Sequence, residues 1–236
     1  MGLFEKERYM RTFASLVLIF SLGFGAAASA QECTDVAYSR VADGYIYKDF
    51  GSVASDEPVI QGGITRTCGN WSYDVWASIG SNGGLANEVD GSVFYNTTAG
   101  PFTVQLSGQY YAVNLHDSLL DASDDMVELY ADVSLPITRG RFTVAPLVRV
   151  IEVVGIDELP TQTLISPGAR FSYQATSHLT VAVDLRESVN LTNGSSTFRF
   201  ESSLGWQLSD RTSVRFGYEG TDRTRSVFSI GASHRF

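Results

Sequence analysis

The sequence predicts an all-β protein, an antiparallel transmembrane β-barrel of about twelve strands. Segments of about ten alternating residues recur between turn signals, as expected of tilted strands that cross a membrane. The last segment places Phe228, Ile230, Ala232 and His234 on one face and ends the chain on Phe236. Barrels of 10 or 14 strands also fit this pattern, and one of 8 strands fits it less well.

The beginning of the chain predicts export. Lys6, Arg8 and Arg11 precede an apolar run over residues 13–24, and small residues follow it up to Ala30. A basic start, a short apolar run and a small-residue cleavage site are typical of a secretory signal peptide. We therefore expect residues 1–30 to be removed and residues 31–236 to form a single barrel domain.

The expected strands cover residues 36–50, 58–68, 71–80, 85–96, 102–115, 126–136, 141–153, 163–174, 178–189, 196–208, 212–220 and 225–236. An even number of strands puts both ends of the chain in the periplasm. Tight connections are expected at 69–70, 97–101, 137–140, 175–177 and 209–211. The connections between them, at 51–57, 81–84, 116–125, 154–162 and 190–195, are mostly longer. Short periplasmic turns and longer outer loops are typical of bacterial membrane barrels.

Aromatic residues separate a membrane barrel from a soluble β-sandwich, which would show the same alternation. At the expected periplasmic ends of the strands, the apolar face carries Trp71, Tyr95, Phe102, Phe142, Tyr173, Trp206 and Phe236. An aromatic girdle at the membrane interface requires this placement.

The opposite face of the strands should line the lumen, and its charges are sorted along the chain. The third to sixth strands carry Asp74, Glu88, Asp90, Glu128 and Asp132, and the seventh to eleventh carry Arg149, Arg170, Arg186, Arg199 and Arg215. Closure of the barrel would set an acidic wall opposite a basic wall around a narrow pore. Alternatively, the charges meet and pair with Asp184, Glu201 and Glu219 to fill the lumen. About twelve strands lies between filled small barrels and open porins, so both interpretations stay open.

The two cysteines, Cys33 and Cys68, lie beside the ends of the first two expected strands. An exported chain with an even number of cysteines favours a disulfide. If the two strands are antiparallel neighbours, both sulfur atoms lie at the periplasmic end and can form this bond.

Composition excludes several classes of function. The chain has 17 basic and 26 acidic residues, a net charge of −9, which disfavours binding to nucleic acid phosphates. The sequence contains no glycine-rich phosphate loop or nucleotide fingerprint. We expect no cofactor and no metal site.

The early part of the expected barrel resembles a known family. The residues concerned are Asp43-Gly44-Tyr45-Ile46-Tyr47, the stretch from Asp56 to Gly63, and Trp71-Ser72-Tyr73-Asp74-Val75-Trp76. They are similar to the TorF-type porins of Gram-negative bacteria and to small outer-membrane barrels more broadly. The resemblance implies a location in the bacterial outer membrane and passive transport.

We therefore expect a narrow porin or channel for small polar solutes, in contact with outer-membrane lipid and lipopolysaccharide. The terminal Phe236 is the expected signal for the barrel-assembly machinery. One alternative is a non-conducting barrel with a structural or adhesive role. A less favoured alternative is a lipid hydrolase that uses His116 and Ser118, whose spacing puts both side chains on one face of a strand.

Overall fold

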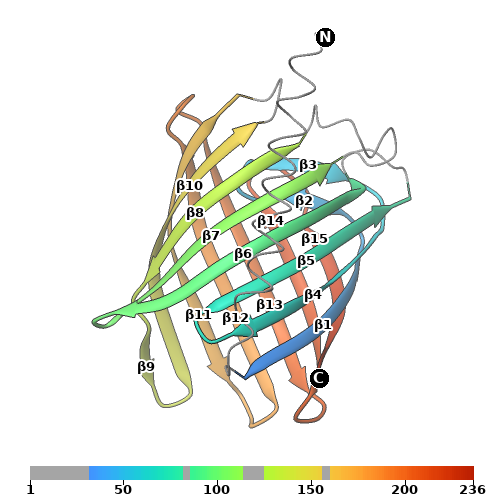
Figure 1. Cartoon of the computed structure of the whole chain (residues 1–236), viewed down its shortest axis with the longest axis vertical. Helices are drawn as coiled ribbons and strands as arrows, with labels where there is room; N and C mark the ends of the chain where they lie inside the picture. Colours follow the sequence, from blue (N-terminus) through green and yellow to red (C-terminus); the bar gives the residue numbers. More distant parts are fainter. Residues whose placement is uncertain (1–31, 82–85, 114–124, 156–159) are drawn as a thin grey trace. The chain divides into compact units, whose positions relative to one another are not determined.

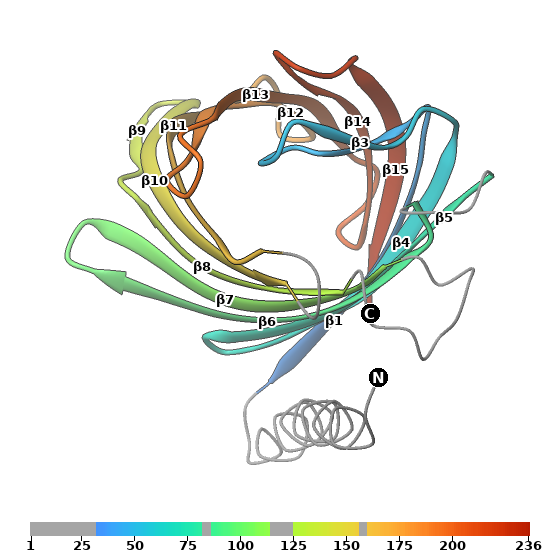
Figure 2. The same ribbon diagram turned by 90° about the horizontal axis from the view of Figure 1, so that it is seen from above.

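The computed structural model describes residues 32–81, 86–113, 125–155 and 160–236. The residues from Thr34 to Phe236 form one unit, a closed antiparallel barrel of twelve strands. Figures 1 and 2 show the strands arranged in a ring. The strands are β1 (Cys33–Ala42), β4 (Val59–Cys68), β5 (Trp71–Gly80), β6 (Glu88–Ala99), β7 (Phe102–Val113), β8 (Met126–Ser134), β10 (Phe142–Gly155), β11 (Gln162–Gln174), β12 (Leu179–Asn190), β13 (Ser196–Gln207), β14 (Thr212–Thr221) and β15 (Val227–Arg235). The predicted strand number is confirmed. The predicted signal peptide, residues 1–30, lies outside the described residues.

Two pairings close the ring. The last strand, β15, pairs with β1 from Val36 opposite Arg235 to Ala42 opposite Ser229. On the far side, β10 pairs with β11 from Phe142 opposite Tyr173 to Val153 opposite Gln162. Every wall strand therefore has two neighbours, which satisfies its backbone groups where lipid offers no hydrogen bonds. Among the described residues, no helix is long and apolar enough to cross a membrane.

Glycines form three of the tight turns at one end of the barrel. Gly69, Gly100 and Gly140 have φ values of 58°, 61° and 60°, a left-handed conformation that glycine adopts without steric cost. Two residues after each glycine, a new strand begins with Trp71, Phe102 or Phe142. These three aromatic side chains are exposed, together with Tyr173, Trp206 and Phe236. The predicted aromatic girdle at this end is confirmed for these six residues, whereas the seventh, Tyr95, is partly buried against the Trp71 ring.

The sixth predicted strand, 126–136, ends early, because β8 stops at Ser134. The short β9 (Ile137–Arg139) lies where a tight connection was predicted at 137–140, and both β8 and β9 pair with β10. The interruption covers Leu135 and Pro136. Proline lacks the N–H group that the ladder needs, so the regular pairing breaks there and resumes after it.

The two faces of β10 differ in how much of their apolar side chains is exposed. Val148, Val150 and Val154 point outward and stay 39–45% exposed, whereas Leu147, Ile151 and Val153 point inward and are 0–4% exposed. Exposed Val75 and Ile79 continue the apolar exterior on β5. An apolar outer surface on a barrel whose inner face carries charges is the arrangement that lipid requires.

The first predicted strand, 36–50, and the predicted outer loop, 51–57, are wrong. The wall strand β1 ends at Ala42, and the chain then enters the barrel as a hairpin of β2 (Tyr45–Tyr47) and β3 (Ser52–Ser55). Gly51, with a φ of 61°, allows the turn. Figure 2 shows this hairpin inside the ring of wall strands. We call residues 43–58 the inner hairpin.

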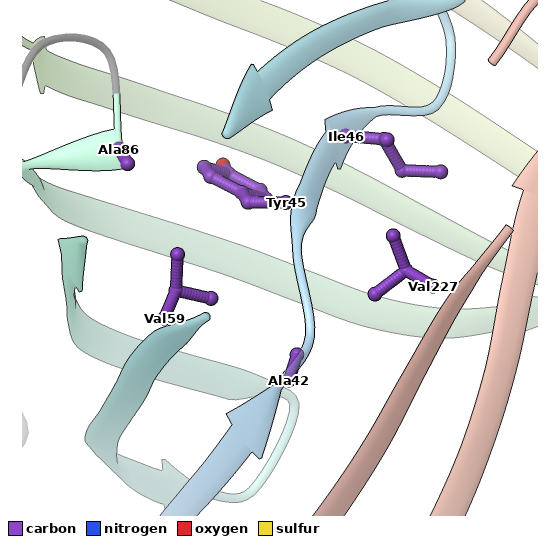
Figure 3. Packing of buried hydrophobic residues seen from close by; sticks show 6 residues of the cluster. All are labelled: Ala42, Tyr45, Ile46, Val59, Ala86 and Val227. Atoms are coloured by element: carbon purple, nitrogen blue, oxygen red, sulfur yellow. The ribbon is translucent and has the colours of Figure 1, made fainter. Parts of the chain in front are cut away.

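Apolar packing holds the inner hairpin at both ends. At its base, Tyr45 and Ile46 join a buried cluster with Ala42, Val59, Ala86 and Val227, which Figure 3 shows. Near its turn, Phe50 packs against a second buried cluster of Tyr130, Ile151, Val153 and Leu164 on the opposite wall. These side chains would otherwise be exposed to water at the rim, which explains why the segment folds inward instead of extending β1.

Cys33 and Cys68 form a disulfide, as predicted. It joins the neighbouring strands β1 and β4 at the end that carries the tight turns. Replacing both cysteines with serine should lower the free energy of unfolding by about 2–4 kcal/mol, because the unfolded chain gains freedom. Urea unfolding in detergent micelles measures this loss, and reduction of the wild-type protein serves as an independent control. Equal stability of the oxidised, reduced and serine forms would contradict the expectation.

Candidate functional site

Two charged residues in the turn of the inner hairpin bind the part of the lumen wall that β12, β13 and β14 form. The Lys48 ammonium lies 2.7 Å from Glu219 and 3.0 Å from Glu201. Beside it, the Asp49 carboxylate lies 2.6 Å from Arg199 and accepts a hydrogen bond of 2.7 Å from the Ser188 hydroxyl. Together these contacts join the hairpin to β12, β13 and β14.

Asp49 is charged at neutral pH despite its position inside the barrel. Burial favours the neutral acid, but the positive charge of Arg199 and the hydrogen bond from Ser188 outweigh burial and hold the pKa of Asp49 below its ordinary value. The ion pair with Arg199 is therefore present under physiological conditions.

The acidic wall is satisfied mainly by hydroxyl groups. Tyr45 and Tyr47 of the inner hairpin donate to Glu88 at 2.9 and 3.2 Å. Asp74 accepts from Tyr38 at 2.8 Å and from Thr65. One oxygen of Glu88 and one of Asp90 are buried without a hydrogen-bond partner among the described residues. The tyrosine and threonine hydroxyls therefore satisfy only part of this acidic wall.

The basic wall is organised around Asp132, which is 4% exposed on β8. Its Oδ2 atom accepts from Arg149 Nη2 at 2.9 Å and from Arg170 Nη2 at 2.8 Å. The same oxygen lies 3.6 Å from Arg186 Nη1. Within this wall, Asp184 accepts from Arg170 and Arg186 at 3.0 and 2.7 Å, and Arg215 donates to Glu201 at 2.8 Å.

All ten charged residues that were predicted to line the pore belong to the strands expected to carry them. The acidic residues lie on β5, β6 and β8, and the arginines lie on β10 to β14. The structure combines both interpretations of these charges. Asp74, Glu88 and Asp90 stay on the acidic side, whereas Asp132 meets three arginines, and Asp184, Glu201 and Glu219 pair with cations. Their role in conduction stays a prediction.

The described residues of the barrel interior form two neighbouring cavities. The larger, about 510 Å³, is bordered by Arg170, Arg186, Arg215 and Asp184. The smaller, about 260 Å³, is bordered by the hairpin segment 45–50 and by Tyr111, Glu128 and Tyr130. Arg149 and Arg199 border both cavities. The two cavities therefore adjoin at these arginines, where Arg199 pairs with Asp49 of the hairpin turn.

Sequence periodicity does not reveal all the residues at the junction of the two cavities. The first predicted wall strand includes Lys48 and Asp49, which lie in the hairpin turn instead. Arg40 lies 3.3 Å from Glu219, but it is absent from the residues predicted to line the pore. A usable signal exists in the turn dipeptide Asp43-Gly44, which together with Gly51 brackets the short alternating stretch Tyr45-Ile46-Tyr47. This signal predicts a hairpin, but it does not tell on which side of the wall the hairpin lies.

The alternative catalytic pair falls outside the described residues. His116 and Ser118 both belong to the segment 114–124. Within the described ranges, no group of three or more His, Cys, Asp or Glu side chains is placed to hold a metal ion.

A closed ring of strands with an apolar exterior, an aromatic girdle and a charged interior defines a transmembrane β-barrel. No family model matches the chain, and no curated protein matches it. Among solved structures it is similar in fold to the KdgM porin, with a TM-score of 0.58, 11% identity and coverage of 86% of this chain and 99% of that one. The KdgM porin in complex with disordered oligogalacturonate gives a TM-score of 0.57 at the same identity and coverage. The NanC porin gives 0.56 at 11% identity, over 85% of this chain and 98% of that one.

Proposed function

We propose that this protein is an outer-membrane channel of Gram-negative bacteria that lets small polar solutes pass by diffusion. One observation carries the proposal: charged side chains border two cavities that share Arg149 and Arg199 at the inner hairpin. A barrel built only for mechanical stability could fill its interior with apolar side chains at lower cost, because buried charges are expensive even when paired.

Two further features support this assignment. The fold is shared with small porins, and the apolar exterior with its aromatic girdle suits a bilayer. The early region that resembles TorF-type porins contains the inner hairpin and the start of β5, so we propose membership of that group. Outer-membrane lipid and lipopolysaccharide would contact the exterior, and Phe236 would be recognised during barrel assembly.

Single-channel recording in planar bilayers tests the proposal. Residues 31–236, refolded in detergent, are expected to give discrete conductance steps. A lumen-facing cysteine at Ser203→Cys, beside the larger cavity, should then let a charged methanethiosulfonate reagent reduce the current. The neighbouring Leu204→Cys variant is the matched control, because Leu204 lies on the exposed outer face.

Both native cysteines are held in the disulfide, so the wild-type current should not respond to the reagent. Equal block of the two variants would show that the current does not pass through the lumen. A folded barrel that gives no current would overturn the channel proposal and favour a structural or adhesive barrel.

A further inference from the structure

The larger cavity has an excess of positive charge. Five arginines border it, together with Asp184 and Glu201; the arginines are Arg149, Arg170, Arg186, Arg199 and Arg215. Two further carboxylates, Asp132 and Asp49, pair with these arginines from outside the lining, so one positive charge is in excess. Four of these arginines come from the four consecutive strands β11, β12, β13 and β14. The register places Arg186 directly opposite Arg199. The two positive charges repel each other at this spacing, so an anion that enters the cavity lowers the electrostatic energy of the pair.

Several donors of these arginines are not used by the described residues. Arg170 donates through Nε and Nη2, and its Nη1 group has no acceptor among them. Arg199 donates only through Nη1, to Asp49. Arg215 donates only through Nη2, to Glu201. Because Arg170 and Arg215 are 41% and 58% exposed, their free donors are accessible to a solute.

Arg186 provides a second, independent observation. Its side chain is 2% exposed, yet its Nη1 atom has no hydrogen-bond acceptor within the described part of the chain. The Asp132 oxygen at 3.6 Å is beyond hydrogen-bond distance. A buried charged donor without an acceptor costs free energy. Because Nη1 itself is closed to solvent, an anion in the cavity would reduce that cost through its charge and not through a hydrogen bond.

We infer that this cavity is a binding site for small solutes that carry two carboxylates. A planar guanidinium group matches a carboxylate through paired hydrogen bonds, and the chain already uses this match between Arg186 and both oxygens of Asp184. The exposed free donors belong to Arg170 on β11 and Arg215 on β14, three strand spacings of about 4.8 Å apart. A solute with a carboxylate at each end can contact both arginines, whereas a single carboxylate contacts one of them. The inference rests on the proposed channel function, since it names the class of solute that enters.

Isothermal titration calorimetry of residues 31–236 in an uncharged detergent at low ionic strength measures solute binding directly. This test does not depend on a measurable channel current. Succinate is the dicarboxylate probe, and acetate and inorganic phosphate are compared at equal ionic strength. We expect succinate to bind more tightly than either. The Arg215→Gln variant should weaken succinate binding about tenfold, the usual effect of one lost charge-assisted hydrogen-bond pair.

The matched control is Arg66→Gln, which removes the same charge from an arginine that pairs with Asp35 outside the cavity. It should bind succinate as the wild type does. Arg215→Lys keeps the charge but loses the planar donor pair, and should fall between the wild type and Arg215→Gln. The heat-dependent shift of folded barrel on an electrophoresis gel confirms that each variant is folded.

Three results would overturn the inference: succinate binding no tighter than acetate, phosphate binding tighter than succinate, or an equal loss in Arg66→Gln and Arg215→Gln. The outcomes also separate the two proposals. Succinate binding in a barrel that gives no current would retain the site and reject the channel. Discrete conductance without succinate binding would retain the channel and reject the site.

Discussion

Replacing residues 44–56 of the inner hairpin with a short Gly-Ser linker is expected to raise the single-channel conductance severalfold. The hairpin contacts β13 and β14 through Lys48 and Asp49, and removing it would join the two cavities into one aqueous lumen. The wall strands should keep their pairing, because β1 and β4 are neighbours and a short linker spans about 4.8 Å between adjacent strands.

A milder variant keeps the hairpin but removes the ion pairs that fix its turn to the barrel wall. Lys48→Met with Asp49→Asn removes the ion pairs but leaves Tyr45 and Phe50 in their apolar clusters. We expect the current of this variant to alternate between the wild-type level and the level of the linker variant. As a control, a Gly-Ser replacement of the exposed turn 191–194 between β12 and β13 should leave the conductance unchanged. Unchanged conductance in the linker variant would show that the hairpin does not limit the flow.

The largest expected loss of stability comes from Asp132→Asn. Asp132 is buried and accepts from Arg149 and Arg170, with Arg186 nearby. Removing its charge leaves guanidinium groups close together without their shared partner, and breaking a buried ion pair costs about 3–5 kcal/mol. Urea unfolding in detergent micelles, followed by tryptophan fluorescence, measures the change.

Asp74→Asn is the matched control for this prediction, because Asp74 accepts hydrogen bonds from Tyr38 and Thr65 and lies on the acidic side of the lumen. Its loss should cost only about 1–2 kcal/mol. Adding Arg186→Gln to Asp132→Asn should recover part of the stability, since one of the repelling charges is removed. Equal losses for Asp132→Asn and Asp74→Asn would show that the arginines do not depend on Asp132.

Alternation along the chain was sufficient to predict the wall of the barrel. The strands β4, β5 and β10 lie within two residues of their predicted positions, and the aromatic residues beside the tight turns are at the expected end. These features depend on neighbours in sequence: side chains of a strand alternate between two faces, and a glycine allows a tight turn wherever it stands. The sorting of lumen charges onto opposite groups of strands could be read in the same way.

The inner hairpin could not be placed from the sequence. Its short alternating stretch has the same period as a wall strand, so Tyr45 to Tyr47 read as a continuation of β1. The partners that hold it inside, Glu201 and Glu219 for Lys48 and Arg199 for Asp49, lie about 150 or more residues further along the chain. Only closure of the ring brings these groups within reach of the hairpin turn.

The sequence by itself therefore determined the fold class and which face of each strand carries charge, because both depend on local periodicity. It favoured twelve strands but also allowed 10 or 14. The tertiary structure decided which charges meet, that Asp132 serves several arginines at once, and that residues 43–58 narrow the lumen. Those outcomes depend on distances across a closed barrel. Such distances follow from the pairing of β15 with β1 and of β10 with β11, and not from any single segment.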